Sequence, residues 1–272
     1  AETLKPDLQN AEIATSVSFA ADGWNFTGNT DAANDNTQRY VAWCWDMGGD
    51  STGLPDVFTA NGSVAHSTSQ QKFGASSIEV GSGDYLTTPD NPVFDFQGDF
   101  TVECWVRRDG DQPDNSGIIS KYEVAGWILE SVSTSHPNKI QWRDQSTGAT
   151  DMRSTTTLSN GTWYHVAVSR RNDVFRLFIN GTMEDSVSTD YNYSVSGMNT
   201  ALYVGRYSAA NSGAWNGFID EIRISDKARY TSNFTAPTAA FSNDANTLLL
   251  IHSDTSNGST TFVDSSGATK NT

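Results

Sequence analysis

The chain has 272 residues and a formal net charge of −15 at pH 7, from 32 acidic and 17 basic residues. Nucleic-acid binding depends on basic patches, and the longest basic run here is Arg170-Arg171, so that class of function is excluded. Thirteen Phe, nine Tyr and eight Trp supply bulk for a core, and no run of apolar residues is long enough to span a membrane. The acidic balance fits an extracellular or particle-surface protein and calcium binding, with solubility alone as the alternative.

The first 39 residues are polar, and SVSFAADGWNF suggests short strands, so residues 1–39 predict a small β-rich segment that ends a preceding module. The chain begins with AETLKP and without Met. We therefore expect either a processed start or a piece of a longer polypeptide.

From residue 40 onward, short apolar stretches alternate with turn sequences such as GSGD and SNGT. Many short strands at this spacing predict an antiparallel all-β sandwich or barrel. Asn180-Gly181 predicts a hairpin turn, and SDKARYTSNF (225–234) predicts a short helical turn. Strands are expected near residues 40–46, 56–61, 76–80, 84–88, 100–107, 117–122, 126–132, 138–143, 163–170, 174–180, 200–206 and 217–225.

The stretch NGFIDEIRIS (216–225) reads as a strand that carries a carboxylate on its apolar face. Because side chains of a strand alternate between faces, Asp220 is expected on the same face as Phe218, Ile222 and Ile224. An ionised carboxylate there needs a partner or a cation. The single carboxylate marks Asp220 as a candidate functional residue.

Two cysteines, Cys44 and Cys104, each lie next to Trp in an expected strand. A disulfide cannot be deduced from sequence, and two buried thiols are the favoured reading. His165, in WYHVAVS, alternates with apolar residues and is expected to be a core histidine.

Three stretches occur in a running order typical of one family: KFGASSIEVGSGDYLTTPDNPVFDFQGDFTVECWVRRDG, NGTWYHVAVSRRNDVFRLFINGTMEDSV and LYVGRYSAANSGAWNGFIDEIRISDKARYTSNF. Over roughly residues 41–235 the chain resembles LamG-like, concanavalin A-like jelly-roll domains. The resemblance implies an antiparallel jelly-roll β-sandwich over residues 40–235 and a C-terminal extension over 236–272, where another module could start. TLLLIHSDTSNGSTTFVDSSG (247–267) also echoes residues 40–62, either as an internal repeat or by chance.

The flanking sequences resemble virion proteins of marine bacteriophages, in which such modules recur in long fibre or appendage polypeptides. This resemblance implies a virion or extracellular location, contacts with other virion proteins and a homo-oligomer. Membrane insertion is not expected.

Relatives of this sandwich often hold a structural calcium ion, and the resemblance assigns Asp220 to it. Calcium prefers sites of six to eight oxygen ligands. The partners of Asp220 would come from its expected neighbourhood, at Asp46, Gly81 and Asp84. The alternative is that Asp220 accepts hydrogen bonds from a turn.

Catalytic signatures are absent from the sequence. The laminarinase-like E-x-D-x-x-E run is missing, and Glu103 and Glu130 stand alone in expected strands. We therefore expect no catalytic residues and a non-enzymatic, lectin-like module that binds glycans or a host surface. A purely structural or decoration module and, less favoured, a glycan hydrolase are the alternatives. Sugars pack on exposed aromatic rings, and the candidates near loops are Trp127, Tyr191, Tyr193, Tyr207 and Trp215; for Trp215, packing over the sheet edge is the favoured alternative.

Overall fold

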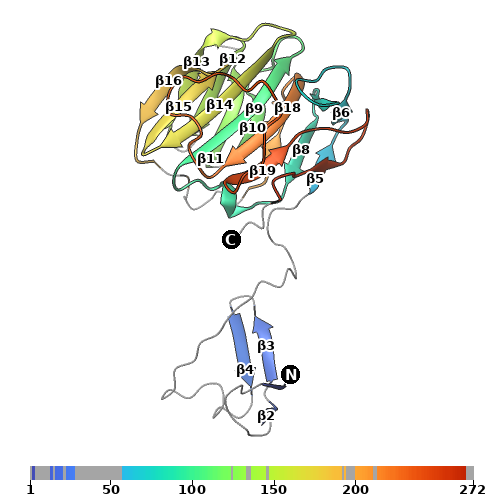
Figure 1. The fold of residues 1–272 in the computed structure, drawn as a ribbon, viewed down its shortest axis with the longest axis vertical. Helices are drawn as coiled ribbons and strands as arrows, with labels where there is room; N and C mark the ends of the chain where they lie inside the picture. Colours follow the sequence, from blue (N-terminus) through green and yellow to red (C-terminus); the bar gives the residue numbers. More distant parts are fainter. Residues whose placement is uncertain are drawn as a thin grey trace. The chain divides into compact units, whose positions relative to one another are not determined.

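The computed structural model describes residues 57–267, except 124, 133–135, 145–146, 192, 194–199 and 211–212, together with four short strands before them. The chain divides into two compact units, Ala1–Gly49 and Asp50–Thr272. In the first unit β1 (Glu2–Thr3) pairs with β2 (Ile13–Ala14), and β3 (Ser16–Ala20) pairs with β4 (Gly23–Thr27), both antiparallel (Figure 1). These strands confirm a β-rich N-terminal segment.

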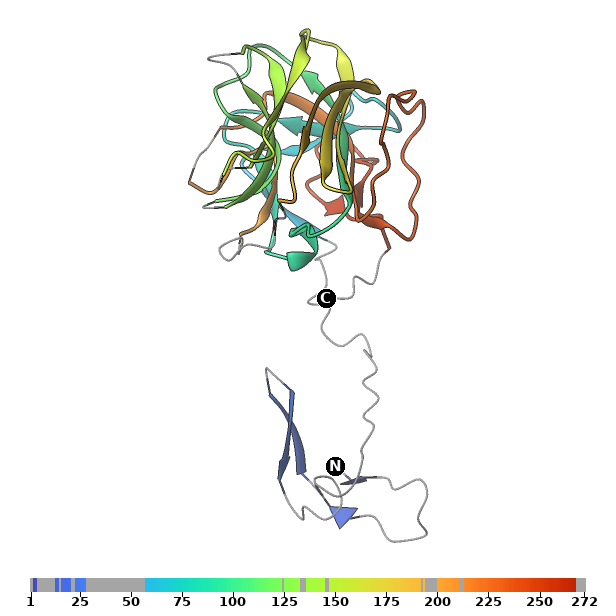
Figure 2. The same cartoon turned by 90° about the vertical axis from the view of Figure 1, so that its left-hand side faces the viewer.

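The second unit is a sandwich of two antiparallel sheets, seen as two layers in Figure 2. Sheet 1 has the strand order β13 (Met152–Thr157), β12 (Lys139–Asp144), β11 (Gly126–Val132), β10 (Ser116–Tyr122), β17 (Leu202–Val204), β8 (Tyr85–Thr88), β5 (Val57–Asn61) and β20 (Phe262–Val263). Sheet 2 has the order β16 (Thr182–Ser188), β15 (Val174–Ile179), β14 (Trp163–Arg171), β9 (Phe100–Arg108), β18 (Gly217–Ser225), β7 (Ser77–Val80) and β6 (Ala65–Ser67), with β19 (Thr247–Ile251) paired to β18. The predicted jelly-roll sandwich is confirmed.

The core lies between the two sheets and follows from strand alternation. Along β9, Phe100, Val102, Cys104 and Val106 are fully buried in it, whereas the residues between them face the other way. Across the core the ring of Phe100 in sheet 2 stacks on the ring of Trp142 in sheet 1, with centroids 5.7 Å apart. Each such side chain contributes about 1.5–3 kcal/mol by leaving water, so the aromatic residues hold the two sheets together.

A β-bulge in β18 corrects the predicted faces of NGFIDEIRIS. The register against β9 shifts between Asp220 and Arg223, and Glu221 adopts a positive φ of 50°. An extra residue at a bulge reverses the alternation. Ile219 therefore joins Ile222 and Ile224 in the core, while Asp220 lies opposite Trp105, which packs on the outer side of sheet 2. The expectation that Asp220 lies on the core face is wrong.

The segment after β18 crosses the outer face of sheet 2 and is called the strap, residues 226–246 (Figure 2). Phe241 of the strap packs with Trp105 and Leu250. The helix expected near residues 225–234 is absent there, because neighbouring segments bind its backbone N–H groups: that of Phe234 donates to the carbonyl of Gly181. Within the described residues the helical element is η2 (Pro92–Phe94), a 3₁₀ turn.

The C-terminal residues that follow the strap complete both sheets. β19 pairs with β18 in sheet 2, and β20 pairs with β5 in sheet 1 through Phe262 opposite Phe58. The two copies of the predicted repeat thus meet at β5 and β20; the first strand of the earlier copy, residues 40–46, lies outside the described residues together with Cys44. No helix in the described part of the chain is long and apolar enough to cross a membrane.

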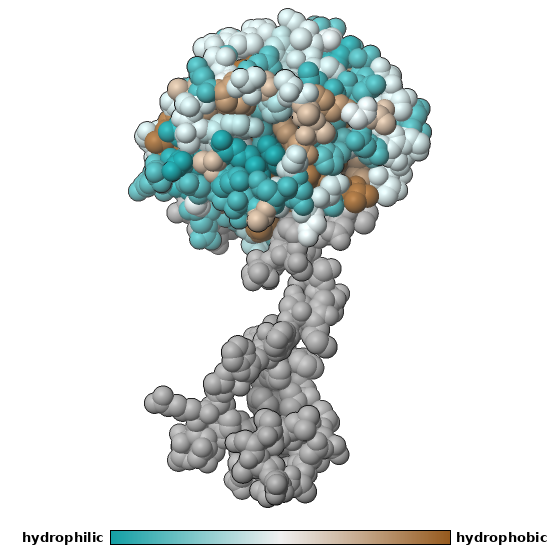
Figure 3. Space-filling view, in the orientation of Figure 1, coloured by the Kyte–Doolittle hydropathy of each residue, from teal (hydrophilic) through white to brown (hydrophobic). Residues whose placement is uncertain are grey.

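The surface of the sandwich mixes hydrophilic and apolar side chains. On the face shown in Figure 3, small apolar patches lie between larger hydrophilic areas. Among the described residues, the large hydrophobic side chains that are exposed are Met183 and Val263. Because these two lie in separate strands of different sheets, they do not form one apolar surface.

Three further local predictions concern a turn, a thiol and a histidine. Asn180 and Gly181 have positive φ values of 50° and 80° between β15 and β16, which confirms the hairpin turn. Cys104 is a free thiol in the core, and burial raises its pKa far above the ordinary range. His165 is fully buried, but it lies beside Trp105 on the outer face of sheet 2 and not in the core between the sheets.

Candidate functional site

A polar pocket opens on the outer face of sheet 1, away from the core. Trp127, Leu129, Ile140 and Trp142 point inward from β11 and β12, so the alternate residues point outward. The pocket has a volume of about 370 Å³. We call it the β11–β13 pocket; its lining residues are Asp114, Asn115, Glu130, Val132, Gln141, Arg143, Asp151 and Arg153.

Strand register brings three of these side chains into one row. Glu130 of β11 lies opposite Gln141 of β12, and Gln141 lies opposite Arg153 of β13. Directly opposite residues have Cβ atoms about 4.5–5.5 Å apart. An acid, an amide and a guanidinium therefore form a continuous polar strip across three strands.

Glu130 is the most perturbed group of the pocket. Its side chain is only 1% exposed, and Oε1 accepts a long hydrogen bond of 3.4 Å from Arg143 Nη1. Burial raises the pKa of Glu130 to about 7, against the opposing pull of the Arg143 charge. Oε2 is buried without a hydrogen-bond partner. Near neutral pH this carboxyl can either donate or accept a hydrogen bond.

Arg153 supplies donors at the other end of the strip. Its Nη2 donates to Gln141 Oε1 at 3.1 Å, and its Nη1 lies 3.2 Å from His136 Nε2. The Nε of Arg153 is buried without a partner. Asp151 beside it accepts the backbone N–H of Asp144, and burial raises the pKa of Asp151. Unpartnered polar atoms in a buried position are costly unless a water or ligand meets them.

Tyrosines border the pocket on the same outer face. The hydroxyl of Tyr207 accepts a hydrogen bond from Arg143 Nη1 at 3.2 Å, and its ring packs edge-to-face on Tyr122 at 5.4 Å. Burial raises the pKa of Tyr207 to about 12. Farther along the sheet the guanidinium of Arg206 lies 4.4 Å from the ring centre of Tyr85. The rings of Tyr122 and Tyr207 are themselves buried, so these residues position Arg143 and do not offer a stacking surface.

The aromatic candidates from the sequence mostly lie elsewhere. Trp127 and Tyr193 are fully buried, so the expectation that they present a sugar-stacking surface is wrong for this structure. Trp215 is also fully buried, in agreement with the favoured alternative of packing. Trp127 Nε1 donates to the Phe94 carbonyl and Trp142 Nε1 to the Tyr193 hydroxyl, which fixes these rings in the core. Tyr191 is half-buried against Tyr193. Tyr207 contacts the pocket residue Arg143, but it is itself buried.

The residues predicted as calcium ligands accept hydrogen bonds from the backbone of different turns. Asp220 is buried; its Oδ2 accepts the N–H groups of Lys72 and Phe73, and Oδ1 that of Glu221. Burial raises the pKa of Asp220 to about 7, against those backbone N–H groups. Asp84 instead accepts the N–H groups of Ser63 and Gly81, while Asp46 lies outside the described residues.

The backbone N–H groups at Asp220 agree with the alternative in which this carboxylate accepts hydrogen bonds from a turn. Among the described residues, no three His, Cys, Asp or Glu side chains lie close enough to hold a metal ion together. Calcium at Asp220 stays a prediction.

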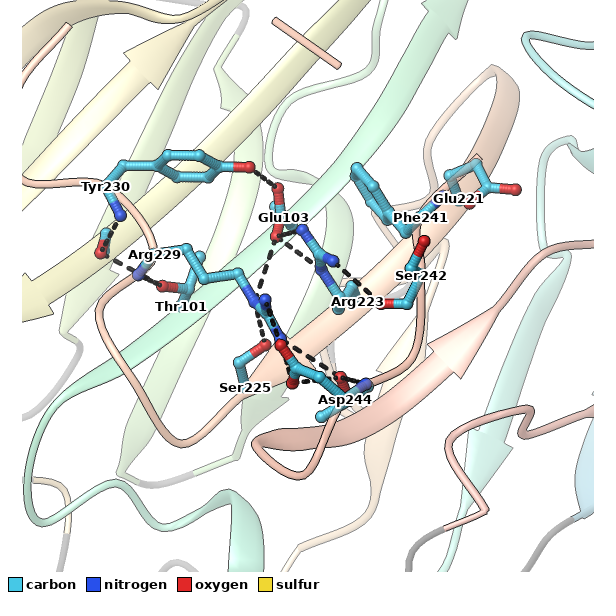
Figure 4. Close-up of polar contacts among 12 residues, drawn as sticks. Thr101, Glu103, Glu221, Arg223, Ser225, Arg229, Tyr230, Phe241, Ser242 and Asp244 are labelled. Atoms are coloured by element: carbon cyan, nitrogen blue, oxygen red, sulfur yellow. Dashed lines mark hydrogen bonds and ion pairs between the residues drawn. The ribbon is translucent and has the colours of Figure 1, made fainter. Parts of the chain in front are cut away.

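A second buried cluster, which the sequence did not reveal, lies under the strap (Figure 4). Glu103 is fully buried and receives hydrogen bonds from Arg223 Nε at 2.8 Å and from the Tyr230 hydroxyl at 2.9 Å; His165 Nε2 lies 3.0 Å away. Burial alone would raise the pKa of Glu103, but His165 and Arg223 outweigh it and lower the pKa. Arg229 and Asp244 both belong to the strap, and the Arg229 guanidinium donates two hydrogen bonds to the Asp244 carboxylate. These contacts fasten the strap, and their burial leaves little room for a ligand.

One strand that lines the pocket carries a recognisable sequence pattern. In IQWRD (140–144), the polar residues Gln141 and Arg143 alternate with large apolar ones. Such alternation marks the outer face of a half-buried strand. Asp114 and Asp151 belong to connecting segments, and no periodic pattern points to them.

Comparison with known protein families agrees with the observed fold. The model described as "Concanavalin A-like lectin/glucanases superfamily" matches residues 80–234. The chain belongs to this superfamily. No curated protein sequence matches the chain. The superfamily match covers the strands from the end of β7 to the strap, including the whole β11–β13 pocket.

Two solved structures of this superfamily's fold are similar in architecture. A proposed carbohydrate binding protein from Bacteroides ovatus is 19% identical with a TM-score of 0.52, over 73% of this chain and 52% of that one. Tailspike protein 2 of the Escherichia coli O157:H7 bacteriophage CAB120 is 14% identical with a TM-score of 0.51, over 75% of this chain and 31% of that one. The chain thus spans about half of the first protein and about a third of the second. At such identities the likeness shows a shared fold.

Proposed function

We propose that this chain is a non-enzymatic, lectin-like module that binds glycans in the β11–β13 pocket. The observation that carries the proposal is the pair of buried, unpartnered polar atoms, Glu130 Oε2 and Arg153 Nε, in residues that line one pocket. Ligand pockets are typically concave sites where a few convergent polar groups fix orientation. Sugar hydroxyls, which both donate and accept, suit a row of acid, amide and guanidinium.

Two independent facts support this reading. The chain belongs to a superfamily whose description includes lectins, and a carbohydrate-binding protein and a phage tailspike have similar folds. The Tyr207 hydroxyl also contacts Arg143, which keeps that guanidinium positioned at the edge of the polar strip. We further propose that the module works outside the cell, on a virion appendage.

A glycan hydrolase is the second candidate, and one observation favours it. Three carboxylates, Asp114, Glu130 and Asp151, line the same pocket, and the pKa of Glu130 is about 7. A glycosidase needs one protonated and one ionised carboxyl across the scissile bond. The Arg143 contact argues for binding, because a guanidinium on Glu130 competes with donation of its proton to a leaving group.

A glycan array probed with wild type and with Glu130→Gln tests the proposal. A glutamine at this position cannot ionise, so we expect array signals to fall about tenfold or more, as for the loss of a hydrogen bond to a charged group. The matched control is Glu79→Gln, since Glu79 is exposed on β7 of the other sheet. Equal signals from all three proteins would contradict the proposal. Release of new reducing ends from a bound glycan would instead favour the hydrolase.

A further inference from the structure

Lys121 occupies an unusual position for a lysine. Its side chain on β10 is 0% exposed, and Nζ lies 2.6 Å from Asp90 Oδ1 and 2.7 Å from Asp95 Oδ1. Lysines are almost never fully buried unless paired. One amine therefore meets two carboxylates at contact distance, away from the β11–β13 pocket residues.

The surroundings hold these three groups in place. Asp90 and Asp95 lie just before and after the 3₁₀ turn η2, whose Asn91 side chain accepts the N–H of Val93. Trp127, which lies opposite Lys121 in β11, donates its Nε1–H to the Phe94 carbonyl of the same turn. The turn cannot shift without breaking the core, so the contacts are preorganised.

The two carboxylates differ in their environment. Asp90 is 39% exposed and accepts a hydrogen bond from Lys121 Nζ. Asp95 is 20% exposed, and its Oδ1 is buried without a well-directed hydrogen bond, although Nζ lies close to it. Burial raises the pKa of Asp95, against the opposing charge of Lys121. Asp95, the more buried of the two, is therefore the better electrophile, and Asp90 is the carboxylate that already accepts a hydrogen bond from Nζ.

Burying an ammonium group is costly even when it is paired, and the cost disappears if the charges are removed. A carboxyl and an amine can condense to a neutral amide without any further reactant. The preorganised approach of the two groups lowers the barrier to this condensation, and removal of the buried charges favours its product.

We propose that Lys121 and Asp95 form an intramolecular amide bond, with Asp90 as the proton-transferring group. Neutral Nζ of Lys121 attacks Cγ of the protonated Asp95 carboxyl, and Asp90 accepts a proton from Nζ. The C–O bond to the departing hydroxyl breaks, Asp90 returns the proton to it, and one water leaves. One N–C bond forms, one C–O bond breaks, and no oxidant or reductant is involved. This modification is independent of the proposed glycan binding.

The bond would cross-link the η2 turn to β10 of sheet 1. A covalent cross-link restricts the unfolded chain and thereby stabilises the fold, as a disulfide does. The described residues contain a single cysteine, Cys104, which is a free thiol. An amide cross-link gives comparable restraint without redox chemistry.

Intact-mass spectrometry of the full 272-residue chain under denaturing conditions tests the proposal. We expect the wild-type mass to fall short of the sequence mass by one water, and tandem spectra to show a branched peptide joining Asp95 to Lys121. Lys121→Met and Asp95→Ala should each have their full sequence mass. Asp90→Ala should show slowed or absent loss of water, and the control Lys139→Met should keep the deficit.

Wild-type protein with its full sequence mass would overturn the proposal, and this outcome does not depend on whether any variant folds. A succinimide, for example at Asp109-Gly110, also loses one water. In that case Lys121→Met would keep the deficit, which would equally overturn the proposal.

Discussion

Replacing Glu130 by Gln should stabilise the fold at neutral and alkaline pH while it weakens glycan binding. The pKa of Glu130 is about 7 in the folded protein against an ordinary value of 4.5. Between these values the folded chain binds more protons than the unfolded chain, so its stability falls as pH rises through that window. The penalty is fully present above about pH 7 and absent below about pH 4.5.

The size of this penalty follows from the same two values. One pKa unit corresponds to about 1.4 kcal/mol, and the interval from 4.5 to about 7 gives about 3 kcal/mol as an upper figure at pH 8. The substituted glutamine keeps an oxygen for the hydrogen bond from Arg143 but never ionises. The variant should therefore unfold at a higher denaturant concentration than wild type at pH 8, and the two should converge near pH 4.5.

Urea or guanidinium titrations from pH 4.5 to pH 8 measure the effect. Asp220, whose pKa is also raised to about 7, contributes a similar dependence to both proteins, so only the difference between variant and wild type is diagnostic. Glu79→Gln, at an exposed position, should show no such pH-dependent difference. A difference between Glu130→Gln and wild type that stays constant with pH would refute the reasoning.

The remaining predictions concern the network under the strap, the core, a turn and calcium. Glu103→Ala should cost about 3–5 kcal/mol in a denaturant titration, because it leaves the buried Arg223 unpaired; a cost below about 1 kcal/mol would contradict the network. Trp142→Ala should cost about 3–5 kcal/mol by the same assay, since its ring stacks on Phe100 of the opposite sheet, and an unchanged midpoint would show that the sheets are held otherwise. Gly181→Ala should lower the melting temperature, because a Cβ would lie 2.0 Å from the Phe234 carbonyl oxygen at a φ of 80°; a higher melting temperature would argue against this turn. Asp220→Ala should lower the melting temperature by leaving the N–H groups of Lys72 and Phe73 without an acceptor; if calcium is bound there, a chelator should also destabilise wild type and leave the variant unaffected, and a chelator without effect on wild type would remove calcium from this site.

Local sequence patterns predicted most of the sandwich, because alternation and turn chemistry act over a few residues. β9 and the hairpin at Asn180-Gly181 are examples in which pattern and structure agree. The face of Asp220 could not be predicted, since the bulge after it depends on the register of β18 against β9. Non-local pairing also decides that β20 joins β5, which the pattern of the tail alone does not show.

The candidate site was less accessible to sequence reasoning for a related reason. Glu130, Gln141 and Arg153 come from three strands and meet only through cross-strand register. Conversely, aromatic residues near loops gave a misleading signal. Trp127 and Trp215 lie in the core, because a large ring contributes more to packing two sheets than to an exposed surface.

Mapping the bound glycan by NMR chemical-shift changes tests the central claim most directly. Full-length protein, labelled at backbone amides and arginine side chains, is titrated with the strongest glycan from the array. Binding in the β11–β13 pocket predicts the largest changes at Glu130, Gln141 and Arg153, including the Nε–H of Arg153, and none in the Glu130→Gln variant at the same concentration. Changes centred on sheet 2, or unaltered in that variant, would contradict the assignment of the pocket.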